Sequence, residues 1–182
     1  QDIMISIDTD LQNQVEFYME DHAKDKEFPS TQCVITDGAT GEIYAAASMP
    51  LFDPTKLDDV KEGATNLSGI TNAFEPGSVF KTVPAMAALE ADIVIPEDEF
   101  DCPARLQADE YYVSDSHARD DATFTFREII NKSSNVGISL VAEKLGFTNL
   151  YNKIIEYGLN EMTGVDYFGE ASGYLLERDY WY

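Results

Sequence analysis

The chain has 182 residues, of which 44% are hydrophobic and 25% are charged; this composition supports one folded domain, or a large part of one, and excludes a compositionally disordered chain. Its formal net charge is −22, with 34 acidic residues against 12 basic ones, and so negative a surface argues against nucleic acid or anionic lipid as a partner. The sequence contains neither a signal peptide nor an apolar run of about 18 residues, which excludes a membrane span within it.

The first 25 residues predict a strand followed by a helix. Isoleucines alternate with smaller or polar residues over residues 3–7, which is typical of a strand. Thr9 or Asp10 can then cap a helix over residues 11–25. The apolar stripe of this helix consists of Leu11, Val15, Tyr18 and Met19.

A hairpin and a stiff loop are expected next. The hairpin has strands at about 32–36 and 43–47, joined by the turn DGATGE. Small alanines in its second strand indicate that another element packs closely against it. Pro50 and Pro54 stiffen the loop that follows.

A second helical pattern extends from Ser78 to about Ala91. Its apolar face consists of Val79, Val83, Met86 and Leu89. Pro84 lies inside the pattern, so we expect the helix to begin late or to bend there. Residues 92–122 are acidic and irregular, and we interpret them as a surface segment near a site, with no task assigned to it.

The last part of the chain predicts three helices and an aperiodic tail. The first helix begins near Thr125, and the second extends over residues 133–146, where a glycine ends it. The third is capped by Thr148 or Asn149 and closed by Gly158. No internal repeat is visible in the sequence.

Neither the cysteines nor the histidines predict a metal site. Cys33 and Cys102 lie far apart without a CxxC pair, and we interpret Cys33, in its apolar run, as a small buried hydrophobe rather than a disulfide partner or a ligand. His22 and His117 lack the spacing of a metal-binding motif such as HExxH. With only two cysteines, the sequence does not indicate whether the protein resides in an oxidising or a reducing compartment.

The first candidate for chemistry is the pair Ser78 and Lys81. Three residues apart on a helix, both side chains lie on one face. A serine hydroxyl needs a base to become a nucleophile, and a lysine can be that base if burial lowers its pKa. At the start of a helix, Ser78 would also have free backbone N–H groups near a developing oxyanion. Taken alone, the spacing favours the alternative of a helix cap beside a surface lysine.

The second candidate is the sequence SSN at Ser133 to Asn135, about 50 residues downstream. The alternative to a catalytic role is that SSN caps a helix with two residues: Ser133 or Ser134 starts the helix, and Asn135 satisfies free N–H groups. A serine–lysine pair, however, needs a further group that passes a proton to the leaving amine, and an amide that holds a peptide substrate. Ser133 and Asn135 supply these two groups in the pattern of the penicillin-recognising enzymes.

With these motifs in this order, the chain resembles the first part of the transpeptidase domain of a class B, monofunctional penicillin-binding protein. The matching blocks are SIDTDLQNQVE, DGATGEIYAAASMPLFDP, NAFEPGSVFK followed by AALE, SSNVGISLVAEKLG and TGVDYFGEASG. The resemblance implies that residues 1–182 form a partial transpeptidase domain. The implied fold is α+β, of the penicillin-binding-protein/β-lactamase-like kind, with a helical subdomain and the first strands of an antiparallel sheet.

The resemblance also implies a reaction, which needs no cofactor. In this family a serine attacks the D-Ala–D-Ala amide of a peptidoglycan stem peptide, and the acyl-enzyme passes to an amine of a neighbouring strand. By motif, Ser78 is the nucleophile, Lys81 its general base and Ser133 the proton relay, while Asn135 binds the substrate amide and helps to orient Lys81. β-Lactams mimic the dipeptide and would acylate Ser78.

The implied partners are peptidoglycan stem peptides, β-lactam antibiotics, and membrane proteins of cell division or elongation, of which the SSN motif slightly favours cell division. The implied location is the extracytoplasmic side of a bacterial membrane, with a membrane anchor expected upstream of Gln1.

The chain departs from the family pattern in one respect. No K-[ST]-G sequence, the family's third motif, occurs in residues 1–182, so we expect a truncated fold without the later strands and poor activity by itself. The alternative functions are a β-lactam sensor and a partner-binding scaffold with the same fold. A class D β-lactamase is disfavoured because its second motif typically ends in Val, where this chain has Asn135.

Overall fold

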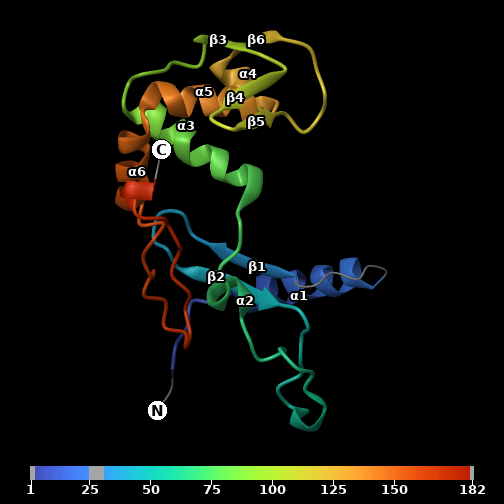
Figure 1. Ribbon diagram of the computed structural model, residues 1–182. Coiled ribbons are helices and arrows are strands. Elements are labelled where there is room, and N and C mark those ends of the chain that lie inside the picture. Colours follow the sequence, from blue (N-terminus) through green and yellow to red (C-terminus); the bar gives the residue numbers. More distant parts are fainter. Residues whose placement is uncertain (1–2, 25–30, 181–182) are drawn as a thin grey trace. The chain divides into compact units, whose positions relative to one another are not determined.

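The computed structural model describes residues 3–24 and 31–180. The chain forms two compact units, which are described separately below. The first comprises residues 1–73 and 164–171, and the second comprises residues 74–163 and 172–182. Figure 1 shows the elements of both units. Among the described residues, no helix is both long and apolar enough to cross a membrane.

The first unit is built on one hairpin. Its elements are α1 (Thr9–Ala23), β1 (Gln32–Thr36), β2 (Ile43–Ser48), the 3₁₀ turn η1 (Leu57–Asp59) and α2 (Ser68–Thr71). β1 and β2 pair in antiparallel fashion, which confirms the predicted hairpin. Ala45 and Ala47 are buried, in keeping with the close packing that their small side chains predicted, and α1 lies against β2.

Residues 3–7 do not form the predicted strand, because their alternation of isoleucines finds no ladder of backbone hydrogen bonds. Two bonds tie the segment to β2: Ser6 Oγ donates to Ile43 O at 2.7 Å, and Asp8 N donates to Tyr44 O at 2.9 Å. The side chain of Ile3 is 88% exposed.

Helix α1 begins one residue earlier than the caps predicted. Asp8, with an extended backbone, accepts a hydrogen bond from Leu11 N and is the N-cap, so Thr9 and Asp10 already lie in the helix. Of the predicted apolar stripe, Met19 is buried, whereas Tyr18 is 58% exposed. The predicted end of the helix at residue 25 lies outside the described residues.

The side chain of Gln12 joins α1 to β2. Gln12 Nε2 donates to Ala46 O at 3.0 Å, and Ala46 N donates to Gln12 Oε1 at 2.8 Å. A glutamine amide carries both a donor and an acceptor, so it satisfies both backbone groups of Ala46 as a neighbouring strand would.

The second unit contains most of the helices. Its elements are η2 (Gly77–Lys81), α3 (Thr82–Glu90), β3 (Glu99–Cys102), β4 (Arg105–Ala108), β5 (Tyr111–Ser114), β6 (Ala122–Thr125), α4 (Phe126–Asn131), α5 (Asn135–Leu145), α6 (Phe147–Glu156) and η3 (Arg178–Tyr180). β3 pairs with β6 and β4 pairs with β5, both antiparallel. The interpretation of residues 92–122 as irregular was therefore wrong, because strands of four residues are too short to show a clear alternation.

Pro84 explains where α3 begins. It lacks an N–H and its ring excludes the carbonyl four residues earlier, so it is tolerated only in the first helical turn. The chain accordingly forms a 3₁₀ turn over residues 77–81, and α3 begins at Thr82, which confirms the late start. The predicted apolar face was wrong, because Val79 is 69% exposed and the buried face is formed by smaller residues. These residues are Pro84, Ala85, Ala87 and Ala88.

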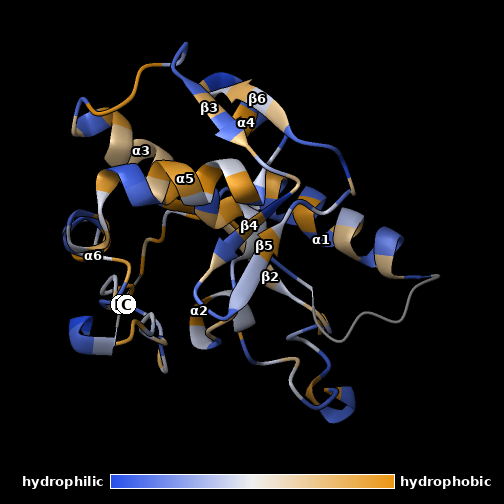
Figure 2. Ribbon diagram, turned by 45° about the horizontal axis from the view of Figure 1, so that its top comes forward, coloured by the Kyte–Doolittle hydropathy of each residue, from blue (hydrophilic) through white to orange (hydrophobic). Residues whose placement is uncertain are grey.

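Helices α3, α4 and α5 supply most of the core of the second unit, and Figure 2 shows apolar residues concentrated on α3 and α5. The buried core residues are Ala85, Ala88, Val94, Cys102, Phe126, Ile129, Val136, Ile138 and Val141. Gly137 permits the contact between α4 and α5, because a Cβ there would lie 2.5 Å from Cγ1 of Ile129. Cys102 is buried and Cys33, in the first unit, is half-buried; neither forms a disulfide.

The boundaries of the last helices agree in part with the sequence. Helix α4 begins directly after Thr125, in agreement with the predicted start, and Thr125 caps it in a capping box with Glu128. Gly146, with a φ of 85°, ends α5 as predicted. It is also the residue before α6, so the predicted caps Thr148 and Asn149 lie inside that helix.

Candidate active site

Ser78 and Lys81 lie in the same 3₁₀ turn of the second unit. Lys81 Nζ is 3.2 Å from Ser78 Oγ, so the two side chains meet as their spacing predicted. Ser78 is exposed and Lys81 is half-buried. Ser78 precedes α3 instead of starting it, so the helix start expected at this serine is wrong.

Ser133 holds the other side of the Lys81 ammonium group. Lys81 Nζ donates to Ser133 O at 2.6 Å and to Ser133 Oγ at 2.9 Å. The structure thus brings together three of the predicted site residues, although Ser133 lies 52 positions from the lysine in sequence. Burial lowers the pKa of Lys81 from its usual 10.5, while the charge of Asp115 acts in the opposite direction.

These three contacts restrict where the N–H groups and the lone pair of Lys81 Nζ can point. As an ammonium group, Lys81 has three N–H donors, one for each of the three acceptors. A neutral amine has two N–H donors and one lone pair. The carbonyl of Ser133 can only accept, so the lone pair must face one of the two hydroxyl groups. With the second N–H on Ser133 Oγ, the lone pair faces Ser78 Oγ, which is the geometry of a base beside a nucleophile.

The position of Ser133 depends on an uncommon backbone conformation. Its φ is +52°, in the left-handed region that non-glycine residues seldom adopt. Ser133 N donates to Ile130 O at 3.1 Å, and Ser134 N donates to Ile129 O at 2.9 Å. Together with Lys132 as C-cap, these bonds form a Schellman motif that ends α4, with serine at the position where glycine is usual.

Helix α5 begins at once after this motif. Ser134 is its N-cap and accepts a hydrogen bond from Gly137 N at 2.9 Å. The capping alternative is therefore correct for Ser134, which is 1% exposed, while Ser133 is left exposed beside Lys81. Asn135 Nδ2 donates to Ser114 O at 2.8 Å, which fixes the orientation of the amide. The contacts found for Lys81 Nζ in the described structure are with Ser78 and Ser133.

Comparison with known proteins identifies the family of this chain. The family model of the penicillin binding protein transpeptidase domain matches residues 31–182. The chain belongs to this transpeptidase family. The resemblance to class B penicillin-binding proteins is thereby confirmed, and so is the expected α+β fold.

Relatives of this transpeptidase domain are similar over almost all of the chain. It is 31% identical to penicillin-binding protein PbpB of Mycolicibacterium smegmatis, over 98% of this chain and 28% of that protein. It is 29% identical to peptidoglycan D,D-transpeptidase FtsI of Escherichia coli, over 98% of this chain and 30% of that protein. The crystal structure of penicillin-binding protein 3 from Mycobacterium tuberculosis, complexed with ampicillin, matches with a TM-score of 0.87 and 28% identity, over 96% of this chain and 39% of that one. The chain thus spans less than a third of the length of these curated relatives.

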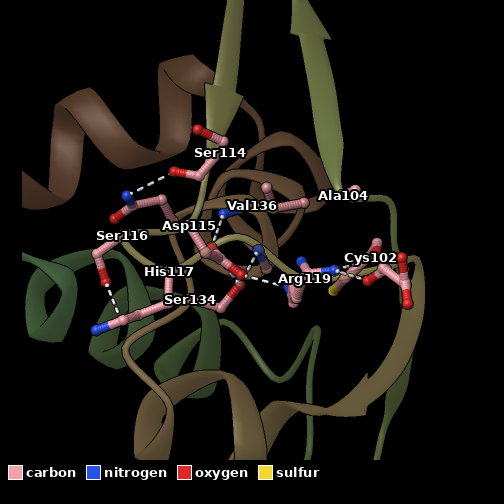
Figure 3. Close-up of polar contacts among 12 residues, drawn as sticks. Cys102, Ala104, Ser114, Asp115, Ser116, His117, Arg119, Ser134 and Val136 are labelled. Carbon is pink, nitrogen blue, oxygen red and sulfur yellow. Dashed lines mark hydrogen bonds and ion pairs between the residues drawn. The ribbon is translucent and has the colours of Figure 1, made fainter.

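Asp115 bonds to Ser134 and Val136 and pairs with Arg119, and no sequence motif had singled out Asp115 or Arg119. Figure 3 shows the Asp115 carboxylate between the start of α5 and the Arg119 guanidinium. Burial raises the pKa of Asp115, but hydrogen bonds from Arg119, the α5 backbone and the Ser134 hydroxyl outweigh it and hold this pKa below its usual value. The one signal in the sequence is an Asp and an Arg four residues apart, and this spacing predicts a contact only within a helical pattern.

No metal centre accompanies these residues in the described parts of the chain. There, no group of three or more His, Cys, Asp or Glu side chains is placed so that it could hold a metal ion.

Proposed function

We propose that residues 1–182 are part of the transpeptidase domain of a D-Ala–D-Ala transpeptidase of peptidoglycan cross-linking, which forms an acyl-enzyme on Ser78. The observation that carries this proposal is the position of Lys81 Nζ, 3.2 Å from Ser78 Oγ and 2.9 Å from Ser133 Oγ. Family membership supports the reaction type, because the matching model is that of a transpeptidase domain.

In the proposed first step, neutral Lys81 removes the proton of Ser78 Oγ as the oxygen attacks the carbonyl carbon of the penultimate D-Ala. The lowered pKa of Lys81 supports this role, because a base must be unprotonated before it can act. Ser133 Oγ, which is bonded to Lys81, then passes its proton to the amine of the terminal D-Ala and receives from Lys81 the proton that came from Ser78. The C–N bond breaks, D-Ala leaves as an amine, and the acyl group remains on Ser78.

In the second step an amine of a neighbouring stem peptide attacks the ester. Its proton returns through Ser133 and Lys81 to Ser78 Oγ, so the enzyme is regenerated with no net change in charge. Asn135 binds the substrate backbone. Its Nδ2 group donates to Ser114 O, which leaves its Oδ1 atom able to accept a hydrogen bond from an amide N–H of the substrate.

The names of the relatives support the proposed ligands. The ampicillin complex of the M. tuberculosis protein supports acylation of Ser78 by β-lactams. FtsI of E. coli is named a peptidoglycan D,D-transpeptidase, which supports stem peptides as substrates. We infer that the domain acts on the extracytoplasmic side of the membrane, with membrane proteins of cell division as its partners.

Labelling with fluorescent penicillin tests the proposed nucleophile. The gene product that carries this sequence is exposed to the probe, digested and analysed by mass spectrometry. We expect one adduct, on Ser78, and no adduct with Ser78→Ala. Lys81→Arg keeps a cation but cannot act as a base, so we expect acylation to slow by about 10²- to 10⁴-fold.

An adduct on a residue other than Ser78, or unchanged labelling of Ser78→Ala, would contradict the proposal. The 182-residue chain alone should label weakly, because its sequence contains no K-[ST]-G motif. Transfer of the acyl group of a D-Ala–D-Ala stem peptide to an added D-amino acid separates a transpeptidase from a β-lactam sensor, which is acylated by β-lactams without turnover. A scaffold that only binds partners should not be acylated efficiently by penicillin.

A further inference from the structure

Asp115 follows β5 and holds the start of α5 through its carboxylate. Ser134 Oγ lies 2.9 Å from Asp115 Oδ1 and 3.0 Å from Oδ2, and Val136 N donates to Oδ1 at 3.1 Å. Figure 3 shows these contacts converging on one side chain. Asp115 therefore fixes both a side chain and a backbone group of the turn that carries Ser133.

Arg119 in turn fixes Asp115. Arg119 Nε lies 2.7 Å from Asp115 Oδ2, and the two side chains are only 19% and 13% exposed. Arg119 Nη1 also donates to Cys102 O at 2.9 Å and to Asp120 O at 2.9 Å, which ties the guanidinium to β3 and to its own loop. A carboxylate with this little exposure is stable only when it is paired and hydrogen-bonded, so the pair keeps one geometry.

The residue before Asp115 holds the same turn at a third point. Ser114 O accepts the hydrogen bond from Asn135 Nδ2, so two consecutive residues at the end of β5 fix three consecutive residues at the start of α5. Ser133 is the next residue on the N-terminal side of these three. Its left-handed backbone is strained for a serine, and such strain persists only where the surroundings fix the chain firmly.

We propose that Asp115, braced by Arg119, is a positioning residue of the reaction, which holds Ser133 in its strained conformation with both its oxygen atoms against Lys81 Nζ. This proposal rests on the function proposed above. Residues 92–122, for which the sequence predicted no task, thereby contribute a positioning residue to the reaction. Asp115 acts through Ser134 and the α5 backbone, and it does not itself contact the reacting atoms.

The charge of Asp115 gives this role a measurable signature. Asp115 is the charged group that raises the pKa of Lys81 against the effect of burial, and Arg119, paired with it, is the nearest cation on the same loop. Lys132, beside Ser133, is directed to the ring of Phe124 at 5.4 Å. Asp115→Asn removes the negative charge, so Lys81 should lose its proton at a lower pH. The acid limb of the acylation profile should shift to lower pH.

The test measures the second-order rate constant of acylation by a fluorescent penicillin against pH, together with thermal melting, in the gene product that carries this sequence. For Asp115→Asn we expect the plateau rate to fall by about 10- to 100-fold, as for a misplaced reacting group, and the acid limb to move to lower pH. The matched control is Asp109→Asn, which removes the same charge from the turn at the other end of β5. Its backbone has a φ of +51°, which asparagine tolerates, and its profile should be unchanged.

A second pair of variants decides the question if Asp115→Asn does not fold. Ser134→Ala removes the cap of α5 and its bonds to Asp115 but keeps the charge. Thr125→Ala removes the comparable cap of α4, away from Lys81. We expect similar losses of melting temperature from both, and a severalfold loss of acylation rate, without a pH shift, from Ser134→Ala alone.

The outcomes separate the two proposals. If Asp115→Asn retains the plateau within twofold and the same acid limb, while Ser78→Ala loses all label, the positioning role is wrong and the transpeptidase function stands. Equal acylation by Ser134→Ala and Thr125→Ala overturns the positioning role in the same way. If Ser78→Ala is still labelled, the proposed function itself is wrong.

Discussion

Ser133 combines a strained backbone with the two oxygen atoms that bind Lys81. The left-handed conformation costs an ordinary L-residue roughly 1–2 kcal/mol, and glycine at this position of a Schellman motif would avoid that cost. The same conformation directs both Ser133 O and Ser133 Oγ to Lys81 Nζ. The strain therefore belongs to a residue whose side chain the proposed reaction requires, which is the usual place for stored strain.

Ser133→Gly should stabilise the fold while it removes the proton relay. Relief of the left-handed strain is opposed by the greater entropy of unfolded glycine, roughly 0.5–1 kcal/mol, so we expect a net gain in the free energy of unfolding of about 0.5–1 kcal/mol. Acylation by penicillin should be much slower. Denaturant unfolding and the labelling rate measure the two effects.

Ser133→Ala is the matched control, because it loses the same hydroxyl group but keeps the strain. We expect it to be less stable than Ser133→Gly and equally slow in acylation. If the glycine variant proved less stable than the alanine variant, the left-handed backbone of Ser133 would not be strained in the way that its φ of +52° indicates.

Among individual residues, the sequence indicated those that belong to short motifs and gave no indication of a contact between Asp115 and Ser134. Ser78, Lys81, Ser133 and Asn135 stand at fixed spacings, so a pattern can identify them. Asp115 lies 19 positions before Ser134, and no spacing rule predicts that their side chains meet. The interaction arises because β5 ends beside the start of α5, which only the fold determines.

Helices α4 and α5 pack through a glycine that has no space for a larger side chain. A Cβ on Gly137 would approach Ile129 Cγ1 to 2.5 Å and two further carbons of the same side chain to 2.9 Å. Ile129 is fully buried and its carbonyl accepts the hydrogen bond that closes the turn at Ser134, so it has little freedom to move. The contact thus links core packing to the geometry of the SSN turn.

Gly137→Ala should therefore destabilise the protein, although the same change inside a helix normally stabilises by about 1 kcal/mol. Overpacking of this kind costs roughly 1–3 kcal/mol, which we expect as a loss in the free energy of unfolding by denaturant. The double variant Gly137→Ala, Ile129→Val shortens the opposing side chain and should recover part of the loss. A more stable Gly137→Ala protein would show that Ile129 can move aside.

Among the secondary-structure elements, the sequence predicted those with long or punctuated patterns. The β1–β2 hairpin has a six-residue turn that begins with Asp and contains two glycines, and α5 ends at a glycine, so local chemistry alone indicated both. The strands β3 to β6 have four residues each and were missed. The buried face of α3 was wrong because alanines, whose small side chains pack closely, form it instead of the larger Val79 and Met86.

The net charge of −22 is a property of the whole molecule and opposes its compaction. Several acidic residues have cationic partners, but 34 acidic residues outnumber 12 basic ones, so repulsion between negative charges dominates the long-range electrostatics. Repulsion of this kind acts over about 10 Å at 0.1 M ionic strength and is screened by added salt. The protein should therefore gain stability as salt is added.

We expect the melting temperature to rise by a few degrees between about 0.1 and 0.5 M NaCl, which corresponds to about 1 kcal/mol for a chain of this size. Differential scanning calorimetry measures the shift. KCl should have the same effect as NaCl, because screening depends on ionic strength. A rise with sulfate alone would indicate exclusion of the salt from the surface instead, and a fall in NaCl would contradict the prediction.

The contact between Gln12 and Ala46 determines which side of the hairpin remains open to a further strand. Ser6, Asp8 and Gln12 bond to backbone groups of Ile43, Tyr44 and Ala46 in β2, and the Gln12 amide occupies both backbone groups of Ala46. A side-chain amide in place of a peptide group ends the sheet there, and it removes a template on which a second chain could extend and aggregate. Any strand that joins this sheet must therefore pair with β1.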